Sequence, residues 1–231
     1  MYSNEISRCC INKLDLNNAK LDIGHYYSSL PHCIIDAVFS IGIKYTATRN
    51  AVERFSQYLS LDTFREFGSD FPNIDKQYSI NQFINFYQKN DIYFITNNVY
   101  KNKCRTSTVN GILKSEAVLE YAKVLQKYKV NYFQDLAKVI NDASFERDIK
   151  YIKGQKSGIS LSYFFMLAGD ENLIKPDRMV ERFVEDCINK KLSTNELTQI
   201  FSKVIKILRP NYPSLTLREL DHEIWKFKSD S

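Results

Sequence analysis

The chain has little glycine and proline and no long run of apolar residues. Seven glycines and five prolines in 231 residues leave few breaks between periodic segments. Although 44% of the residues are hydrophobic, no stretch approaches the roughly 18 consecutive apolar residues that a membrane span needs. The first residues are polar and lead into no apolar core, so no secretion signal is visible. We therefore expect a cytoplasmic protein with no membrane partner.

The cysteines also lack a pattern. Their spacing contains no C-x-x-C pair, which argues against a zinc site or an iron–sulfur cluster. In a cytoplasmic protein, scattered cysteines are typically reduced thiols. We therefore expect free thiols, no metal and no cofactor. The five cysteines are Cys9, Cys10, Cys33, Cys104 and Cys187.

What the chain does have is helical periodicity and a moderate positive charge. Apolar residues recur at steps of three and four, as in Val118, Tyr121, Ala122 and Leu125. The formal charge of +5 is compatible with a polyanionic partner. We predict an all-α fold, with residues 92–95 as the one short segment of β character. The predicted helices lie near residues 31–42, 47–59, 78–89, 111–129, 132–140, 144–152, 159–168, 178–190, 194–208 and 216–227.

A basic turn between two of these helices is the most informative segment. Ser144 is placed to cap the first helix, 144–152, and the second helix begins at residue 159. A glycine turn that opens into a helix directs unpaired N–H groups and the positive end of the helix dipole at one point. Such a point favours an anion, for example a phosphodiester. The turn consists of Lys153, Gly154, Gln155, Lys156, Ser157 and Gly158.

Asp177 follows this second helix after a short loop and stands where the next helix begins. The ordinary role of an aspartate at that place is to cap the helix. The order of these elements resembles that of the helix-hairpin-helix (HhH-GPD) DNA glycosylases: a helix, a glycine hairpin, a second helix, a short loop and an aspartate. This superfamily includes endonuclease III and the alkylpurine glycosylases. Residues 36–42 resemble the early helix of that superfamily, and residues 113–117 resemble its central helix.

The resemblance implies a two-lobed helical architecture over residues 1–231, with the active site in the cleft between the lobes. Residues 31–160 or so would form the central lobe, ending in the helix-hairpin-helix of residues 144–168. Residues 1–30 and about 170–231 would form the second lobe. We expect a monomer that binds double-stranded DNA.

The departures from the family pattern narrow the expected chemistry. The second glycine of the family hairpin is replaced by Lys156, and Gly158 stands where bifunctional members carry the lysine that forms a Schiff base. The resemblance therefore implies a monofunctional glycosylase that leaves an abasic site. Asp177 would stabilise the positive charge that builds on the sugar, or orient and deprotonate the attacking water. Alkylated purines, in DNA repair, and modified cytosines of phage DNA, in anti-phage defence, remain alternative substrates.

An enzyme that acts on a base must flip it out of the duplex, which requires a pocket and a wedge residue. The turn that begins at Gly42 lies where members of the resembling family carry the wedge, but a glycine occupies the closest match. Ile43 or Tyr45 could take its place, although each could also be an ordinary packing residue. His25, Tyr26 and Tyr27 are candidates for the base pocket. Trp225 is either another stacking residue or a core residue braced by an Asp221–Arg218 pair.

A second hypothesis fits the same hairpin. A catalytically silent helix-hairpin-helix module would hold DNA through its phosphates alone. Asp177 distinguishes the two hypotheses, because an ionised carboxylate beside the phosphate backbone is of no use to a protein that only binds DNA.

Overall fold

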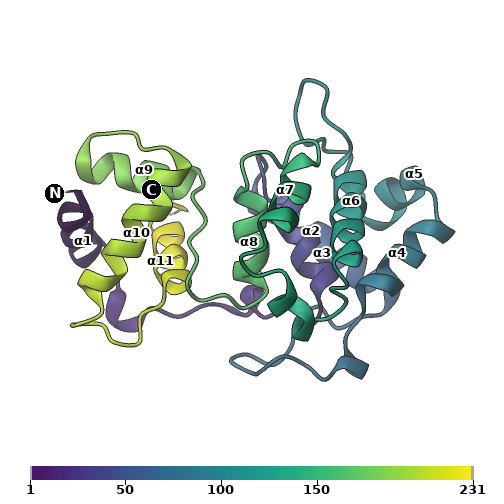
Figure 1. The fold of residues 1–231 in the computed structure, drawn as a ribbon, viewed down its shortest axis with the longest axis horizontal. Helices are drawn as coiled ribbons and strands as arrows, with labels where there is room; N and C mark the ends of the chain where they lie inside the picture. The colour runs from purple at the N-terminus through teal and green to yellow at the C-terminus, as the bar shows by residue number, and fades with distance from the viewer. Residues whose placement is uncertain (1, 230–231) are drawn as a thin grey trace. The chain divides into compact units, whose positions relative to one another are not determined.

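The computed structural model describes residues 2–229, and it confirms the all-α fold. The only extended pairings among the described residues are two isolated bridges, Tyr27–Phe64 and Arg105–Leu113. The chain divides into two compact units (Figure 1). Unit 1 contains the chain up to Asp22 and from Gly169 onward, and unit 2 contains residues 23–168. No helix in residues 2–229 has both the length and the hydropathy of a bilayer-crossing segment.

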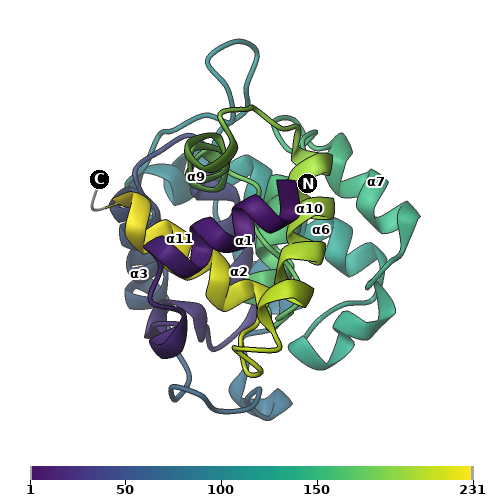
Figure 2. The same ribbon diagram turned by 90° about the vertical axis from the view of Figure 1, so that its left-hand side faces the viewer.

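In the described part of unit 1, the α-helices are α1 (Tyr2–Lys13), α9 (Arg178–Ile188), α10 (Thr194–Leu208) and α11 (Leu217–Ser229). Helix α1 packs against α9 and α10, and α11 packs against the same two helices (Figure 2). Their shared core consists of aliphatic and phenylalanine side chains, among them Phe183, Val204 and Leu220. The sequence did not predict α1, because most of its residues are polar and only Ile6, Ser7 and Cys10 are buried.

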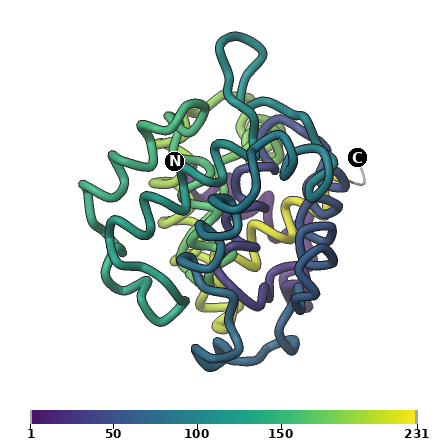
Figure 3. The backbone as a smooth tube through the Cα atoms, turned by 90° about the vertical axis from the view of Figure 1, so that its right-hand side faces the viewer, coloured from purple at the N-terminus to yellow at the C-terminus, as the bar shows by residue number. Residues whose placement is uncertain are grey.

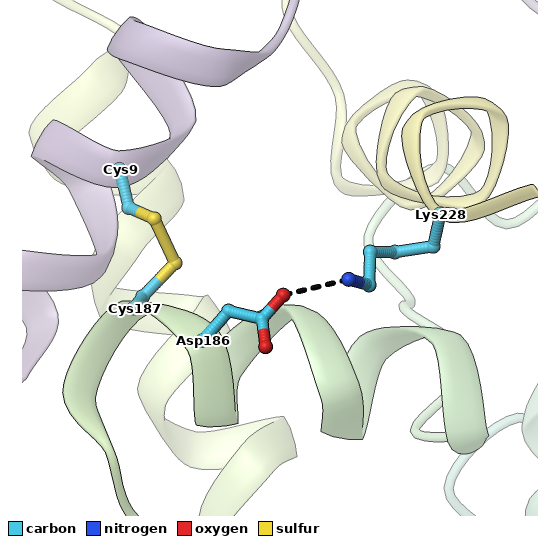
Figure 4. The surroundings of a disulfide bond; sticks show 4 residues. All are labelled: Cys9, Asp186, Cys187 and Lys228. Atoms are coloured by element: carbon cyan, nitrogen blue, oxygen red, sulfur yellow. Dashed lines mark hydrogen bonds and ion pairs between the residues drawn. A yellow bond between two sulfur atoms is a disulfide. The ribbon is translucent and has the colours of Figure 1, made fainter. Parts of the chain in front are cut away.

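A disulfide joins α1 to α9 in unit 1, between Cys9 and Cys187 (Figure 4). The expectation that all five cysteines are free thiols was therefore wrong. The two cysteines are 178 residues apart in the sequence, so spacing could not reveal the pair, and the helix that brings Cys9 to α9 was not predicted. Beside the bond, Lys228 of α11 forms an ion pair of 2.6 Å with Asp186 of α9.

Unit 2 is built around one buried helix, α2 (Leu30–Phe39), which packs against α3, α4, α6 and α8 (Figure 3). Every residue of α2 is buried. The longer helices of unit 2 besides α2 are α3 (Tyr45–Leu59), α4 (Ile80–Lys89), α6 (Lys114–Lys127), α7 (Ala143–Tyr151) and α8 (Ile159–Leu167). The described residues also form four short 3-10 turns: η1 (Leu16–Asn18), η2 (Ile23–His25), η3 (Ile74–Lys76) and η5 (Phe133–Lys138).

A buried side chain of α6, Lys114, caps the C-terminal end of α2. The Lys114 ammonium donates hydrogen bonds to the carbonyl oxygens of Phe39 (2.7 Å) and Ile41 (2.5 Å). The carbonyls at the end of a helix have no partners within the helix, and the negative end of the helix dipole favours a cation there. Two segments that we singled out in the sequence, residues 36–42 and 113–117, thus meet in unit 2.

Residues 92–95 are helical, so the prediction of β character was wrong. They form α5 (Ile92–Phe94) and the start of a π-helical turn, η4 (Ile95–Val99). The Asp91 carboxylate caps this segment by accepting hydrogen bonds from the N–H groups of Tyr93 (2.8 Å) and Phe94 (2.9 Å). The β-branched and aromatic composition suggested a strand, but the cap and the burial of Ile95 and Val99, four residues apart, favour a helix.

The environments of the cysteines predict how many thiols react. Cys10 and Cys33 are 0% exposed, and burial raises the pKa of Cys10 to about 12. Cys104 is half-buried and lies in a loop. We expect an aromatic disulfide reagent to label one thiol, Cys104, in the native protein, and all three free thiols after unfolding without a reductant. The replacement Cys104→Ser should abolish the native reaction. Five reactive thiols in the unreduced, unfolded protein would contradict the Cys9–Cys187 bond.

Candidate active site and nucleic-acid interface

The turn between α7 and α8 in unit 2 is a glycine hairpin. Helix α7 begins at Asp142, whose carboxylate accepts hydrogen bonds from the N–H groups of Ser144 (2.8 Å) and Phe145 (3.0 Å). Ser144 is therefore not the cap that the sequence suggested. Asp142 and Ser144 are both good capping residues two positions apart, and the structure selects the carboxylate, which accepts two N–H groups at once.

Two glycines with positive φ shape the hairpin itself. Gly154 has φ +86° and Gly158 has φ +76°, a backbone conformation in which side chains other than hydrogen are strained. The Gln155 N–H donates to the carbonyl of Ile152 (2.9 Å), and the Gly158 N–H donates to the carbonyl of Gln155 (3.0 Å). Gly158 is the N-cap of α8 and has no side chain of its own to cap that helix, and the N–H of Ile159, the first residue of α8, donates to the Ser157 hydroxyl. The positive end of the α8 dipole is thus directed at the hairpin, where it favours an anion.

Cationic side chains surround this turn. Lys153, Lys156 and Ser157 are exposed, and the Ser157 hydroxyl lies 3.4 Å from the N–H of Ile159. A shallow depression of about 450 Å³ runs along the hairpin. It is lined by Arg147, Lys150, Tyr151, Ile152, Lys153, Gly154 and Lys156. The charge and shape of this surface suit a phosphate group.

Asp177 caps α9 in unit 1, and only one of its carboxylate oxygens takes part in the cap. Its Oδ1 accepts hydrogen bonds from the N–H groups of Met179 (2.8 Å) and Val180 (3.4 Å). Its Oδ2 lies 3.7 Å from the Lys175 ammonium. The side chain of Asp177 is 27% exposed, so the carboxylate is accessible to a small molecule or to water.

A second carboxyl group, Asp221 of α11, lies close enough to Asp177 for the two to interact electrostatically. Its Oδ1 accepts a hydrogen bond of 2.9 Å from the backbone N–H of Lys175. Burial and, to a smaller extent, the charge of Asp177 raise the pKa of Asp221 to about 8, although Lys175 acts in the opposite direction. At neutral pH Asp221 is therefore mostly protonated. Neighbouring carboxyl groups with different protonation states are typical of acid–base sites.

The remaining candidates of unit 1 lie on the same helix as Asp221. Trp225 is half-buried one turn further along α11, and its ring is stacked on that of His222 at 6.1 Å between centroids. Arg218 is 3% exposed and its backbone N–H donates to the carbonyl of Glu171. Lys175, Asp177 and Asp221 thus form one cluster, with Trp225 on the helix that supplies Asp221.

The pocket candidates from the N-terminal part of unit 2 differ in exposure. His25 is half-buried. Tyr26 is also half-buried, with its ring 5.0 Å from that of Phe67 and 5.3 Å from the Arg65 guanidinium. Tyr27 is 1% exposed and its hydroxyl donates to Asp36 (2.7 Å), so Tyr27 is part of the core of unit 2. A base could not stack on its ring in this conformation.

The two wedge candidates lie at the turn between α2 and α3 in unit 2. Ile43 is half-buried in the turn, and Tyr45 is the first residue of α3, also half-buried. Gly42, next to Ile43, has φ +71° and open space around its Cα. The turn is therefore accessible but has no fully exposed apolar side chain.

Comparison with known proteins gives one match. A family model described as a domain of unknown function, DUF8548, matches residues 4–229, nearly the whole chain. The chain belongs to this family. No curated protein and no solved structure matches it.

Sequence reasoning missed the role of Lys175 and understated that of Asp221. Lys175 stands two residues before Asp177, a spacing that places the two side chains near each other across Pro176. Asp221 follows Lys175 by 46 residues in the sequence, and it joins the cluster only because α11 packs against α9. The Lys-Pro-Asp spacing was a usable signal, but nothing in the sequence paired it with Asp221.

The raised pKa of Asp221 predicts how stability depends on pH. The folded state holds the proton of Asp221 up to about pH 8, whereas the unfolded carboxyl has a pKa near 3.8. The contribution of this proton to the free energy of unfolding is fully present below the pKa of the unfolded state, and it is lost as the pH rises through the pKa of the folded state. We expect the denaturant midpoint of the wild type to fall between about pH 5 and pH 9, and the fall to be smaller for Asp221→Asn.

A matched control is Asp186→Asn. A hydrogen bond from Lys228 lowers the pKa of Asp186, so this carboxyl titrates below the tested window and its replacement should leave the slope unchanged. If Asp221→Asn showed the same slope as the wild type, Asp221 would not hold a proton at neutral pH.

Proposed function

We propose that this protein is a monofunctional DNA glycosylase that hydrolyses the N-glycosidic bond of a damaged or modified base in double-stranded DNA. The observation that carries the proposal is the geometry of Asp177. It caps α9 through Oδ1, leaves Oδ2 outside the cap at 3.7 Å from the Lys175 ammonium, and follows a basic glycine hairpin in the chain. The proposal assigns DNA binding to the hairpin of unit 2 and bond cleavage to the carboxylate cluster of unit 1.

The hairpin would bind the phosphate backbone rather than the bases. The positive end of the α8 dipole is directed at the turn, and the exposed side chains of Lys153 and Lys156 add charge beside it. Contacts of this kind position a protein on DNA without reading its sequence, and they weaken as salt rises.

Cleavage of the N-glycosidic bond would depend on the negative charge of Asp177. Departure of the base builds positive charge on the sugar, and the Asp177 carboxylate stabilises that charge more strongly in the transition state than in the ground state. The departing nucleobase keeps the electron pair of the broken bond, and the oxygen of a water molecule adds to the anomeric carbon. The proton that this water loses passes to the Asp177 carboxylate and from there, through solvent, to the released nucleobase. Asp221, being protonated, adds no second negative charge to the cluster that could repel an approaching phosphodiester.

A test of the catalytic role compares two capping aspartates. Asp177→Asn keeps an oxygen for the two N–H groups at the start of α9 but removes the charge, so we expect base release to fall on the order of 100-fold or more, with DNA binding retained. Asp142→Asn makes the same change at the start of α7 and should leave the rate unchanged. Duplexes with alkylated purines, deaminated and oxidised bases, and phage-type modified cytosines serve as substrates, and alkaline cleavage detects abasic sites.

The outcomes separate the hypotheses. A folded Asp177→Asn protein that releases base at the wild-type rate rules out Asp177 as the catalytic group. A wild-type protein that binds DNA in a salt-sensitive way but releases no base from any of these duplexes is the catalytically silent binding module instead. The substrate that is cleaved fastest decides between repair of alkylated purines and removal of phage-type cytosines.

The product should be an intact abasic strand. In the resemblance to the helix-hairpin-helix glycosylases, Gly158 stands at the position of the Schiff-base lysine of the bifunctional enzymes, and glycine has no side-chain amine. We expect borohydride to trap no covalent complex between this protein and cleaved DNA, whereas a bifunctional glycosylase tested in parallel is trapped. Trapping that disappeared in Lys175→Ala would contradict this expectation and identify Lys175, beside Asp177, as a nucleophile.

A further inference from the structure

A finger of chain lies between the π-helical turn η4 and α6 in unit 2 and projects from the helices around it (Figures 1 and 3). Backbone hydrogen bonds join its two sides: the Thr106 N–H donates to Ile112 (2.9 Å), and the Lys114 N–H donates to Cys104 (2.9 Å). We call residues 101–113 the finger. Its tip turns tightly, because a Cβ on Gly111 would lie 2.4 Å from the backbone of Ser107. The finger therefore has a defined shape.

The finger packs directly against the glycine hairpin. A Cβ on Gly154 would lie 2.4 Å from the Cβ and 2.8 Å from the Oγ1 of Thr106. Real Cβ atoms do not approach other atoms so closely, so the Thr106 side chain occupies the space that the glycine leaves free. Thr106 Oγ1 also accepts a hydrogen bond of 3.2 Å from the Ile112 N–H, which links this contact to the other side of the finger.

The two elements share one electrostatic character. Residues 92–115, which include the finger, contain no aspartate or glutamate, and the same is true of residues 149–169, which include the hairpin. In the finger, Lys101, Lys103 and Arg105 are all exposed. The contact between Thr106 and Gly154 thus joins two acid-free segments, and the basic depression of the hairpin lies beside it.

Exposed apolar side chains accompany these charges. Tyr151, which lines the depression, is 92% exposed, and Val109 at the finger tip is 75% exposed. Both side chains are therefore accessible to a ligand that contacts the basic surface. Proteins bind nucleic acid strands with cations that neutralise phosphates and with aromatic rings that stack on bases, and they insert apolar side chains into a groove.

We propose that the finger is a second DNA-contacting element, locked onto the hairpin by Thr106, so that hairpin and finger hold neighbouring parts of one duplex. Lys101 and Lys103 neutralise phosphates beyond those held by the hairpin, and Val109 enters the groove between the strands. This inference rests on the proposed function only for its ligand, DNA, and does not require base release.

The test measures affinity for an undamaged, fluorescently labelled duplex by anisotropy, over a range of salt from about 0.05 to 0.2 M. Lys101→Gln with Lys103→Gln removes two surface charges outside any helix. We expect its affinity to fall on the order of tenfold or more and the slope of log K against log salt to become shallower by about 1.8, since each lost phosphate contact contributes about 0.9.

Two further variants make the result interpretable. Lys123→Gln with Lys138→Gln removes the same charge from unit 2 at lysines that pair with Glu120 and Asp135, and we expect the wild-type slope. Lys153→Gln with Lys156→Gln tests the hairpin alone and should also make the slope shallower. Val109→Asp changes the net charge by only one unit, and it should still weaken binding more than the control variant, which loses two positive charges.

Each outcome has one reading. A weakened hairpin variant beside an unchanged finger variant overturns this inference and leaves the proposed function intact. An equal loss in the finger variant and in the matched control also overturns it, because the effect would then be net charge alone. A wild-type protein without salt-sensitive DNA affinity overturns the proposed function itself. Tighter binding of a single strand than of the duplex would overturn the assignment of Val109 to a groove.

Discussion

The burial of α2 along its whole length is the constraint on which unit 2 depends. Burying ten consecutive residues also buries polar groups, and each of these needs a hydrogen-bonding partner, because an unsatisfied buried group costs about 1–3 kcal/mol. Lys114 binds the carbonyls at the end of the helix, and Tyr27 donates to Asp36. His32 lies between the hydroxyls of Ser29 (2.9 Å) and Ser56 (3.0 Å), and burial lowers its pKa to about 4, so it stays neutral. These contacts tie α3, through Ser56, and α6, through Lys114, to α2.

The position of the hairpin follows from this arrangement. Helix α8 packs against α2 with an apolar surface, so its N-terminus and the turn before it are held on a rigid support. Helix α6 begins where the finger ends, and Lys114 ties that point to α2. The hairpin and the finger are thus attached to α8 and α6, which both pack against α2. A preorganised surface of this kind loses less conformational entropy on binding than two free loops would.

The sequence predicted the parts of the structure that depend on local chemistry. Periodicity predicted the all-α fold, and the Asp177 cap agrees with its place at a helix start. Local chemistry could not choose between Asp142 and Ser144 as a cap, nor could it separate a capped helical turn from a strand at residues 92–95, where β-branched residues dominate. Contacts between distant segments were also out of reach. The Cys9–Cys187 bond, the Lys175–Asp221 hydrogen bond and the Thr106–Gly154 contact join segments that only the packing of helices brings together.

The disulfide also bears on the order in which the chain can fold. Unit 2 is continuous, whereas unit 1 is made of the first segment and the last, so synthesis on the ribosome completes unit 2 before α9, α10 and α11 exist. During that time the other helices of the unit 1 core are missing, and Cys9 cannot form its disulfide because Cys187 has not been synthesised. Once the bond closes, a cut anywhere within residues 23–168 leaves both fragments covalently joined through unit 1. After a single cut within unit 2, the two fragments should therefore separate on a denaturing gel only when a reductant is present.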